Sequence, residues 1–210
     1  MSRWPFSRQG SAVLLLGLLV ACRWPGMLPP NFSPVYALAF CAGVYLPDRL
    51  AWWLPMVILL ITDVILNIHY SVPILSAYMA LNYVAYAALI GLGRRFSAHS
   101  SWLHLLGGGL LGAFLFYLIT NTAAWFNPAP GPYPQVPYPK TFFGWVQALT
   151  VGMSPWPPTW TFFRNTLLSG GLFTSLFASV MRFVPETEPE DRGAEDTEGD
   201  PSGEPEPAGN

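Results

Sequence analysis

An apolar run in the first third of the sequence decides the fold of this protein. Residues 51–68 read AWWLPMVILLITDVILNI. A run of about 20 residues that are nearly all apolar can cross the hydrocarbon core of a bilayer as an α-helix. The one ionisable side chain in this run is Asp63. We therefore predict that the segment is a membrane-spanning helix that carries a single carboxylate.

Similar apolar segments recur on both sides of this run. The chain has 210 residues, of which 52% are hydrophobic and 10% charged, whereas soluble domains carry roughly 25% charged residues. An open β-sheet cannot satisfy its backbone in lipid, so the segments should be helices. The predicted class is all-α, a polytopic bundle of about six transmembrane helices in residues 1–184. The six segments are Ala12–Cys22, Pro34–Leu46, Ala51–Ile68, Pro73–Gly93, Trp102–Phe126 and Leu167–Val184.

The first segment allows two interpretations. Ala12–Cys22 is short for a span, and Leu19-Val20-Ala21-Cys22 has the form of a bacterial lipoprotein cleavage box. Residues 1–22 are therefore either a retained first helix or a signal that is cleaved at Cys22. We prefer the retained helix, with the Arg23 side chain reaching outward to water.

Two further segments depart from the pattern of spans. Asn127–Trp160 contains nine prolines, and its apolar middle, Thr141–Met153, is too short to cross a bilayer. We predict a short interfacial or re-entrant helix there, before the last span. Residues 185–210 hold ten of the twelve acidic residues and no aromatic side chain. We predict that they form a disordered acidic cytoplasmic tail.

The basic residues predict an orientation. Before Glu186 the chain has nine Arg and Lys and two Asp, so its formal charge there is +7. With six spans and a cytoplasmic N-terminus, six of the nine basic residues fall at cytoplasmic ends, as the positive-inside rule expects. These six are Arg3, Arg8, Arg49, Arg94, Arg95 and Arg182. The expected location is a bacterial inner membrane, with several passes and with both termini in the cytoplasm.

Polar residues within the spans gather on the predicted outer side, except that Asn82 lies near the middle of its span. Polar groups at membrane depth are costly, so their shared position indicates an outward-facing polar pocket. The predicted ligand-binding residues are Asn31, Asp63, Asn67, Asn82, Asn121, Trp125, Arg164 and Asn165. Trp125 and Trp160 are expected to stack on the ligand. The alternative is that these groups only join helices, with an ion pair between Asp63 and Arg164.

Small residues four positions apart form a second pattern. Such pairs allow helix backbones to approach closely. Those in the fifth and sixth spans, such as Gly108 with Gly112, suit packing inside the bundle. Gly17 and Ala21 in the first span suit either the same packing or docking onto a partner membrane protein.

No motif for catalysis or for metal binding is present. The sequence has no phosphate-binding loop, no nucleophile elbow and no HExxH spacing. We therefore expect no enzymatic activity, no cofactor and no metal centre in this chain, and any ATP hydrolysis must come from a partner.

Several strings resemble a family of small six-span bacterial membrane proteins of unknown function. They are Pro30–Val35 followed by Ala37–Ala39, Thr62-Asp63, Thr120-Asn121 with Trp125, and Phe163–Leu168. More distantly, the layout is similar to the substrate-binding (S) components of energy-coupling-factor transporters. That resemblance implies capture of a vitamin or a metal from outside and docking, through small residues of the first helix, onto a membrane coupling protein driven by ATPases.

Together, these features predict a substrate-binding subunit of a small-molecule uptake transporter. The alternative is a non-catalytic structural or accessory subunit that packs in a larger membrane complex. The expected partners are the lipid bilayer and either the coupling protein with its ATPases or other membrane subunits. No nucleic acid is expected among them.

Overall fold

The computed structural model describes residues 7–127 and 136–184. Within these ranges the chain forms seven helices and no strand, so the predicted all-α class is confirmed. The helices are α1 (Arg8–Ala21), α2 (Val35–Tyr45), α3 (Asp48–His69), α4 (Ala77–Gly93), α5 (Trp102–Phe126), α6 (Phe142–Leu149) and α7 (Thr159–Phe183). The predicted acidic tail, residues 185–210, lies outside the described residues.

Among the described residues, three helices are long and apolar enough to cross a membrane, namely α3, α5 and α7. The prediction of about six such helices is wrong in number, because α1, α2 and α4 have only 14, 11 and 17 residues. Proline shortens α2, which lies between Pro34 and Pro47. The fourth segment was predicted from Pro73, but α4 begins at Ala77. Ser76 caps this helix start, because its hydroxyl accepts a hydrogen bond from the Met79 N–H.

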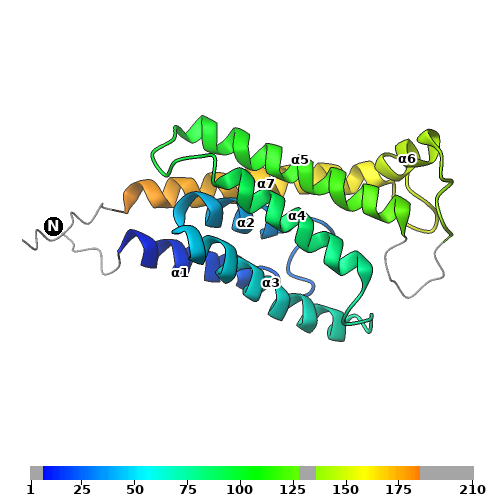
Figure 1. The fold of residues 1–210 in the computed structure, drawn as a ribbon, viewed down its shortest axis with the longest axis horizontal. Coiled ribbons are helices and arrows are strands. Elements are labelled where there is room, and N and C mark those ends of the chain that lie inside the picture. The colour runs from blue at the N-terminus through cyan, green and yellow to red at the C-terminus, as the bar shows by residue number, and fades with distance from the viewer. Residues whose placement is uncertain (1–6, 128–135, 185–210) are drawn as a thin grey trace, which may run out of the picture.

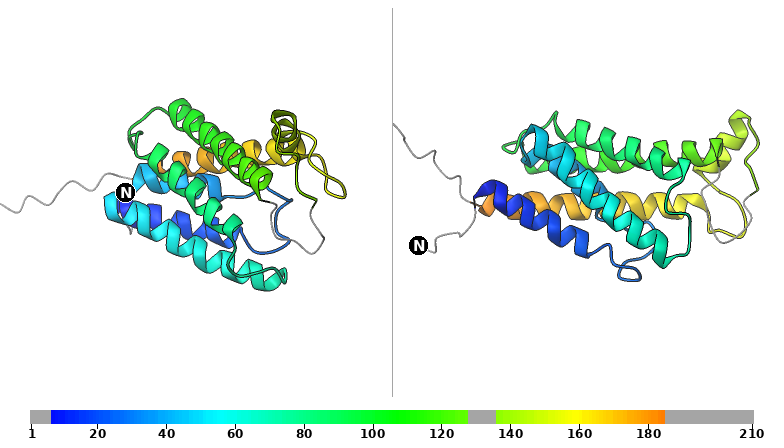
Figure 2. Two further views of the ribbon diagram at one scale, coloured as in Figure 1. Left: turned by 45° about the vertical axis from the view of Figure 1, so that its right-hand side comes forward. Right: turned by 60° about the horizontal axis from the view of Figure 1, so that its bottom comes forward.

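The short helix α2 lies at the centre of the bundle. Its residues 35–44 are all buried, and it packs against α1, α3, α4, α5 and α7 (Figures 1 and 2). A helix of 11 residues is about 16 Å long, which is roughly half of the hydrocarbon thickness of a bilayer. The bundle therefore has a buried central helix that fills only part of its length.

Glycines allow the central helix to approach its neighbour α4 at backbone distance. A Cβ added to Gly93 would lie 2.2 Å from the backbone oxygen of Phe40, and one added to Gly43 would lie 2.3 Å from the backbone of α4. Similarly, a Cβ on Gly109 of α5 would lie 2.3 Å from Oγ1 of Thr174 on α7. The small residues of α5 and α7 thus pack inside the bundle, as one of the two interpretations expected.

One end of the bundle, which we call the closed end, holds the α2–α3 connection and the 94–101 loop (Figure 1). Arg94 joins these connections. Its guanidinium donates to the backbone oxygens of Leu46 at 3.1 Å and Gly43 at 3.4 Å, and it pairs with Asp48. A cation next to the last carbonyls of α2 stabilises that helix end. The start of α1 and the end of α7 lie at the same end (Figure 1).

The opposite end, which we call the cavity end, holds the 22–34 connection between α1 and α2, the α3–α4 connection and α6 (Figures 1 and 2). The predicted short helix before the last span is present as α6. It is fixed to α5 by two hydrogen bonds. The indole N–H of Trp145 donates to Thr122 at 2.9 Å, and the hydroxyl of Tyr117 donates to the backbone oxygen of Leu149 at 2.7 Å.

Candidate ligand-binding cavity

A cavity of about 570 Å³ opens at the cavity end, beside the N-terminus of α2. Its walls come from the 22–34 connection and from α2, α3, α4, α5 and α7. The space arises because α2 has only 11 residues, whereas α5 and α7 have 25 each. Between the start of α2 and the cavity end, no helix occupies the centre of the bundle. Its size lies within the range of sites that hold small molecules.

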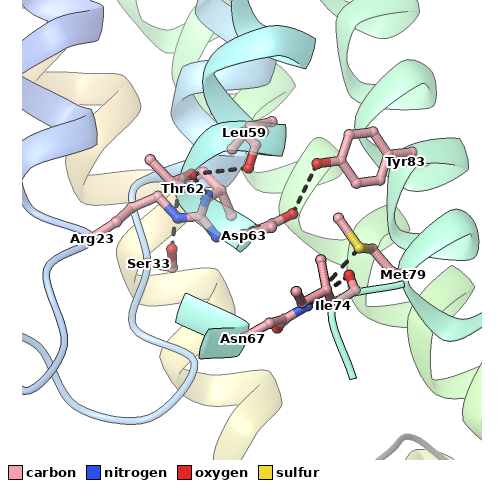
Figure 3. A network of polar contacts seen from close by, with 10 residues as sticks. Arg23, Ser33, Leu59, Thr62, Asp63, Asn67, Ile74, Met79 and Tyr83 are labelled. Carbon is pink, nitrogen blue, oxygen red and sulfur yellow. Dashed lines mark hydrogen bonds and ion pairs between the residues drawn. The ribbon is translucent and has the colours of Figure 1, made fainter. Parts of the chain in front are cut away.

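A mostly buried ion pair stands in the wall of the cavity (Figure 3). Nη2 of Arg23, in the 22–34 connection, lies 2.5 Å from Oδ1 of Asp63 on α3, and the two side chains are 10% and 13% exposed. The guanidinium also donates to the hydroxyl of Thr62. The hydroxyl of Tyr83, on α4, donates to Oδ2 of Asp63 at 3.1 Å. Each charge thus has partners, and the network ties together the connection, α3 and α4.

One face of α4 is polar where it lines the cavity. Tyr78, Asn82 and Tyr86 lie one helical turn apart and all three line the space. Oδ1 of Asn82 is buried and has no hydrogen-bond partner among the described residues. A buried acceptor without a donor costs about 1–3 kcal/mol. This oxygen therefore marks a position where a donor from a bound molecule would be stabilised.

Aromatic rings cover another part of the cavity, and we call Tyr36, Phe116 and Tyr86 the aromatic wall. The ring of Phe116 lies 4.8 Å from that of Tyr36, and it stacks on Tyr86 at 5.5 Å with an interplanar angle of 21°. The hydroxyl of Tyr36 lies 3.4 Å from the hydroxyl of Thr166 and donates to the backbone oxygen of Asn31 at 3.3 Å. These contacts hold the wall in place, and of its three rings only Phe116 is partly exposed.

The structure brings four of the eight predicted ligand-binding residues together. Asn31, Asp63, Asn82 and Asn121 all line the cavity, and they come from four different elements. The amide of Asn121 donates to the backbone oxygen of Tyr117 within α5 at 2.8 Å. These positions agree with a polar cluster at one end of the bundle.

Two other predicted residues are not among the residues that line the cavity, and instead hold connections in place. The amide of Asn67 donates to the backbone oxygens of Ile74 at 3.2 Å and Pro73 at 3.3 Å, which closes the α3–α4 connection. The indole N–H of Trp125 donates to the backbone oxygen of Pro139 at 2.8 Å. Both side chains support the cavity end from outside the cavity.

The remaining two also do not line the cavity, and of these Arg164 is exposed and Asn165 is partly buried. The guanidinium of Arg164 donates to Oδ1 of Asn165 at 3.3 Å and lies 6.0 Å from the ring centre of Trp160, which is also exposed. The amide of Asn165 donates to the backbone oxygen of Pro30 at 3.0 Å. The predicted ion pair between Asp63 and Arg164 is wrong, because Arg23 occupies that role from the 22–34 connection.

The predicted docking residues, Gly17 and Ala21, lie on an exposed face of α1. A Cβ added to Gly17 would meet nothing within 4 Å. Leu14 and Leu18 on the same helix are 51% and 58% exposed. This face is therefore not used for packing within the described part of the chain.

Arg23, Tyr78 and Tyr86 are functional candidates that the sequence analysis did not identify. Arg23 was expected to reach outward, but its guanidinium turns to Asp63. The i, i+4 spacing of Tyr78, Asn82 and Tyr86 is visible in the sequence and indicates one polar helix face. In the described residues, no group of three or more His, Cys, Asp and Glu could hold a metal ion.

Residues 7–127 and 136–184 thus form an all-helical fold in which three helices are long enough to cross a membrane, with an open, mostly polar cavity at one end of the bundle. The chain belongs to DUF6580, a family of unknown function, which matches residues 6–191. Membership of a family of unknown function is thus confirmed. No curated protein and no solved structure matches the chain, so the resemblance to S components stays a prediction.

Proposed function

We propose that this is an integral membrane protein that captures a small molecule in its cavity, as the substrate-binding subunit of an uptake transporter. The observation that carries the proposal is the cavity itself. Its volume of about 570 Å³ suits a small molecule, and five helices and the 22–34 connection converge on it. A bundle that served only as a scaffold would not require such an opening at one end.

A membrane location accounts for the exposed surface and for the irregular connection. On α3, the large apolar side chains Trp53, Ile61 and Ile68 are exposed by 71%, 54% and 61%, which lipid would cover. Non-helical backbone at membrane depth is tolerated where it lines a cavity, and the 22–34 connection does so. In this arrangement α2 is shielded from lipid by the other helices.

The orientation in our proposal places the cavity outside and both termini in the cytoplasm of a bacterial cell. Arg49, Arg94 and Arg95 belong to the closed end, next to the α2–α3 and α4–α5 connections. Arg23 is used by an ion pair at the other end. The positive-inside rule then favours a cytoplasmic closed end.

Uptake requires a partner, since the sequence has no ATPase motif. The open face of α1 at Gly17 supports docking onto a membrane coupling protein that works with ATPases. The same open face favours the alternative function, a structural or accessory subunit of another membrane complex. The two functions differ in whether the cavity takes up a molecule and in whether an ATPase is bound.

Labelling of the native cysteines tests the open cavity and its orientation. Cys22 lines the cavity and is partly exposed, whereas Cys41 is fully buried on α2. A membrane-impermeant maleimide added to intact cells should modify Cys22 and leave Cys41 unmodified, and a Cys22→Ser variant should give no signal. Absence of Cys22 labelling in the purified folded protein, with labelling after denaturation, would count against an open cavity and against this function.

Purification in mild detergent separates the two functions. The proposal expects ATP hydrolysis to copurify with the wild-type protein and to be lost in a Gly17→Phe variant, whose ring would block close docking on α1. A stable complex without ATPase activity would instead favour the structural subunit.

A further inference from the structure

We propose that the cavity binds an uncharged, planar molecule that carries an N–H or O–H donor, an inference that rests on the proposed capture of a small molecule. Three features support this ligand class. They are the state of the charges in the wall, an acceptor without a donor, and the position of aromatic rings next to that acceptor.

The charges in the cavity wall are already neutralised. Among the residues that line it, the Arg and Asp side chains are Arg23 and Asp63, and they form an ion pair with each other at 2.5 Å. The guanidinium of Arg23 also donates to the hydroxyl of Thr62, and the carboxylate of Asp63 also accepts from the hydroxyl of Tyr83. A charged ligand would therefore meet no free counter-charge to compensate for the part of its hydration that it loses on binding. This feature disfavours ions, including metal ions.

The oxygen of Asn82 requires a donor. It is buried and unpaired among the described residues, although its helix face borders open space. Other polar groups in the wall are engaged, such as the amide of Asn121 and the hydroxyl of Tyr36. A ligand N–H or O–H would thus gain its strongest hydrogen bond at Asn82, because this pairing removes the penalty of the orphan acceptor.

The surroundings of Asn82 favour a flat ligand. Tyr86 lies one helical turn from Asn82 on the same face of α4, and it is a member of the aromatic wall with Phe116 and Tyr36. Aromatic rings gain most from other flat rings in offset or edge-to-face contact. A planar molecule could contact the partly exposed ring of Phe116 in the cavity and direct its donor to Asn82.

The ligand class can be tested with four probe molecules. The measurement is how far each probe slows the reaction of Cys22 with a maleimide in the purified full-length chain at neutral pH. Indole-3-acetamide is neutral, planar and a hydrogen-bond donor. Indole-3-acetate and tryptamine keep the ring but carry a negative and a positive charge, and cyclohexylacetamide keeps the neutral amide without a flat ring. We expect indole-3-acetamide alone to slow the modification of Cys22 in a concentration-dependent way.

An Asn82→Leu variant tests the acceptor. It should raise the half-protecting concentration of indole-3-acetamide about tenfold, the effect of one lost buried hydrogen bond. The matched variant Asn67→Leu removes an amide outside the cavity lining and should keep the wild-type value. In each variant, Cys41 should stay unreactive, which checks that the chain is folded.

The outcomes separate this inference from the function on which it rests. Equal or better protection by either charged probe overturns the neutral class, while capture of a small molecule stands. Protection by cyclohexylacetamide overturns the requirement for a planar ring, and unchanged protection in Asn82→Leu overturns the role of the acceptor. Protection by none of the four also overturns the ligand class. The open cavity itself is contradicted only if Cys22 does not react with the maleimide in the folded protein when no probe is present.

Discussion

The two ends of the central helix α2 lie in opposite surroundings. At the closed end, Gly43 and Gly93 bring two backbones into contact, and Arg94 covers the last carbonyls of the helix. At the cavity end, α2 begins beside open space, and Arg23 and Asp63 join its neighbours through charge and hydrogen bonds. Close packing therefore fixes one end and polar contacts fix the other.

The largest loss of stability is expected from Gly93→Ala at the closed end. The new methyl group would lie 2.2 Å from the backbone oxygen of Phe40, so α2 and α4 must separate. We expect the free energy of unfolding to fall by about 3 kcal/mol, the upper part of the range for overpacked cores. Unfolding in mixed micelles with increasing SDS, followed by tryptophan fluorescence, measures this change.

Gly91→Ala is the matched control for that variant, two positions earlier on the same helix. A Cβ there would meet only the ring of Trp52, at 3.9 Å. Since alanine is a better helix former than glycine, the free energy of unfolding should stay unchanged or rise by up to about 1 kcal/mol. Equal losses in the two variants would show that the α2–α4 crossing does not determine the effect.

An intermediate loss is expected from Asp63→Leu at the cavity end. The substitution leaves the guanidinium of Arg23 without its carboxylate. Removal of one partner from a fully buried pair costs about 3–5 kcal/mol. Water in the open cavity can solvate Arg23, so we expect a smaller loss of about 2 kcal/mol, below the lower end of that range. The same SDS titration measures it.

The double variant Arg23→Met with Asp63→Leu sharpens this result. With both charges removed, no unpaired ion remains, so the double variant should regain most of the stability that the single variant loses. A double variant that is as unstable as Asp63→Leu would mean that the carboxylate acts through Tyr83 and α4 and not through Arg23.

The smallest loss is expected from Trp125→Phe, at the rim of the cavity end. The variant removes the hydrogen bond to Pro139 and keeps an aromatic ring, so the free energy of unfolding should fall by about 1 kcal/mol. Lys140, which donates to the backbone oxygens of Trp125 and Phe126, should become more accessible to trypsin. The rate of Cys22 labelling should not change. A changed rate would place Trp125 in the access path to the cavity.

The sequence predicts two of the three long helices well, whereas α7 begins at Thr159 and not at the predicted Leu167, and the short helices are predicted poorly. The apolar run at Trp102–Phe126 matches α5 at both ends, and the run at 51–68 differs from α3 by only a few residues. Continuous apolar runs define such helices without help from the rest of the chain. The length of α2 and the late start of α4 depend on flanking prolines and on packing, so hydropathy alone overestimates their reach.

The cavity could be predicted only in part, for a similar reason. Asp63 and Asn82 are conspicuous because they interrupt apolar segments, and both line the cavity. The role of Arg23 depends on the path of the 22–34 connection in three dimensions, which no local pattern encodes. Tyrosines such as Tyr78 are easily taken for residues of the membrane interface, where they are common.

The burial of α2 has a consequence for the order in which the chain is assembled. Its residues 35–44 are all covered in the finished bundle, and part of this cover comes from α4, α5 and α7, which are synthesised later. A nascent chain that ends before these helices leaves α2 without its partners. The helix at the centre of the protein is thus synthesised before four of the five helices that pack against it.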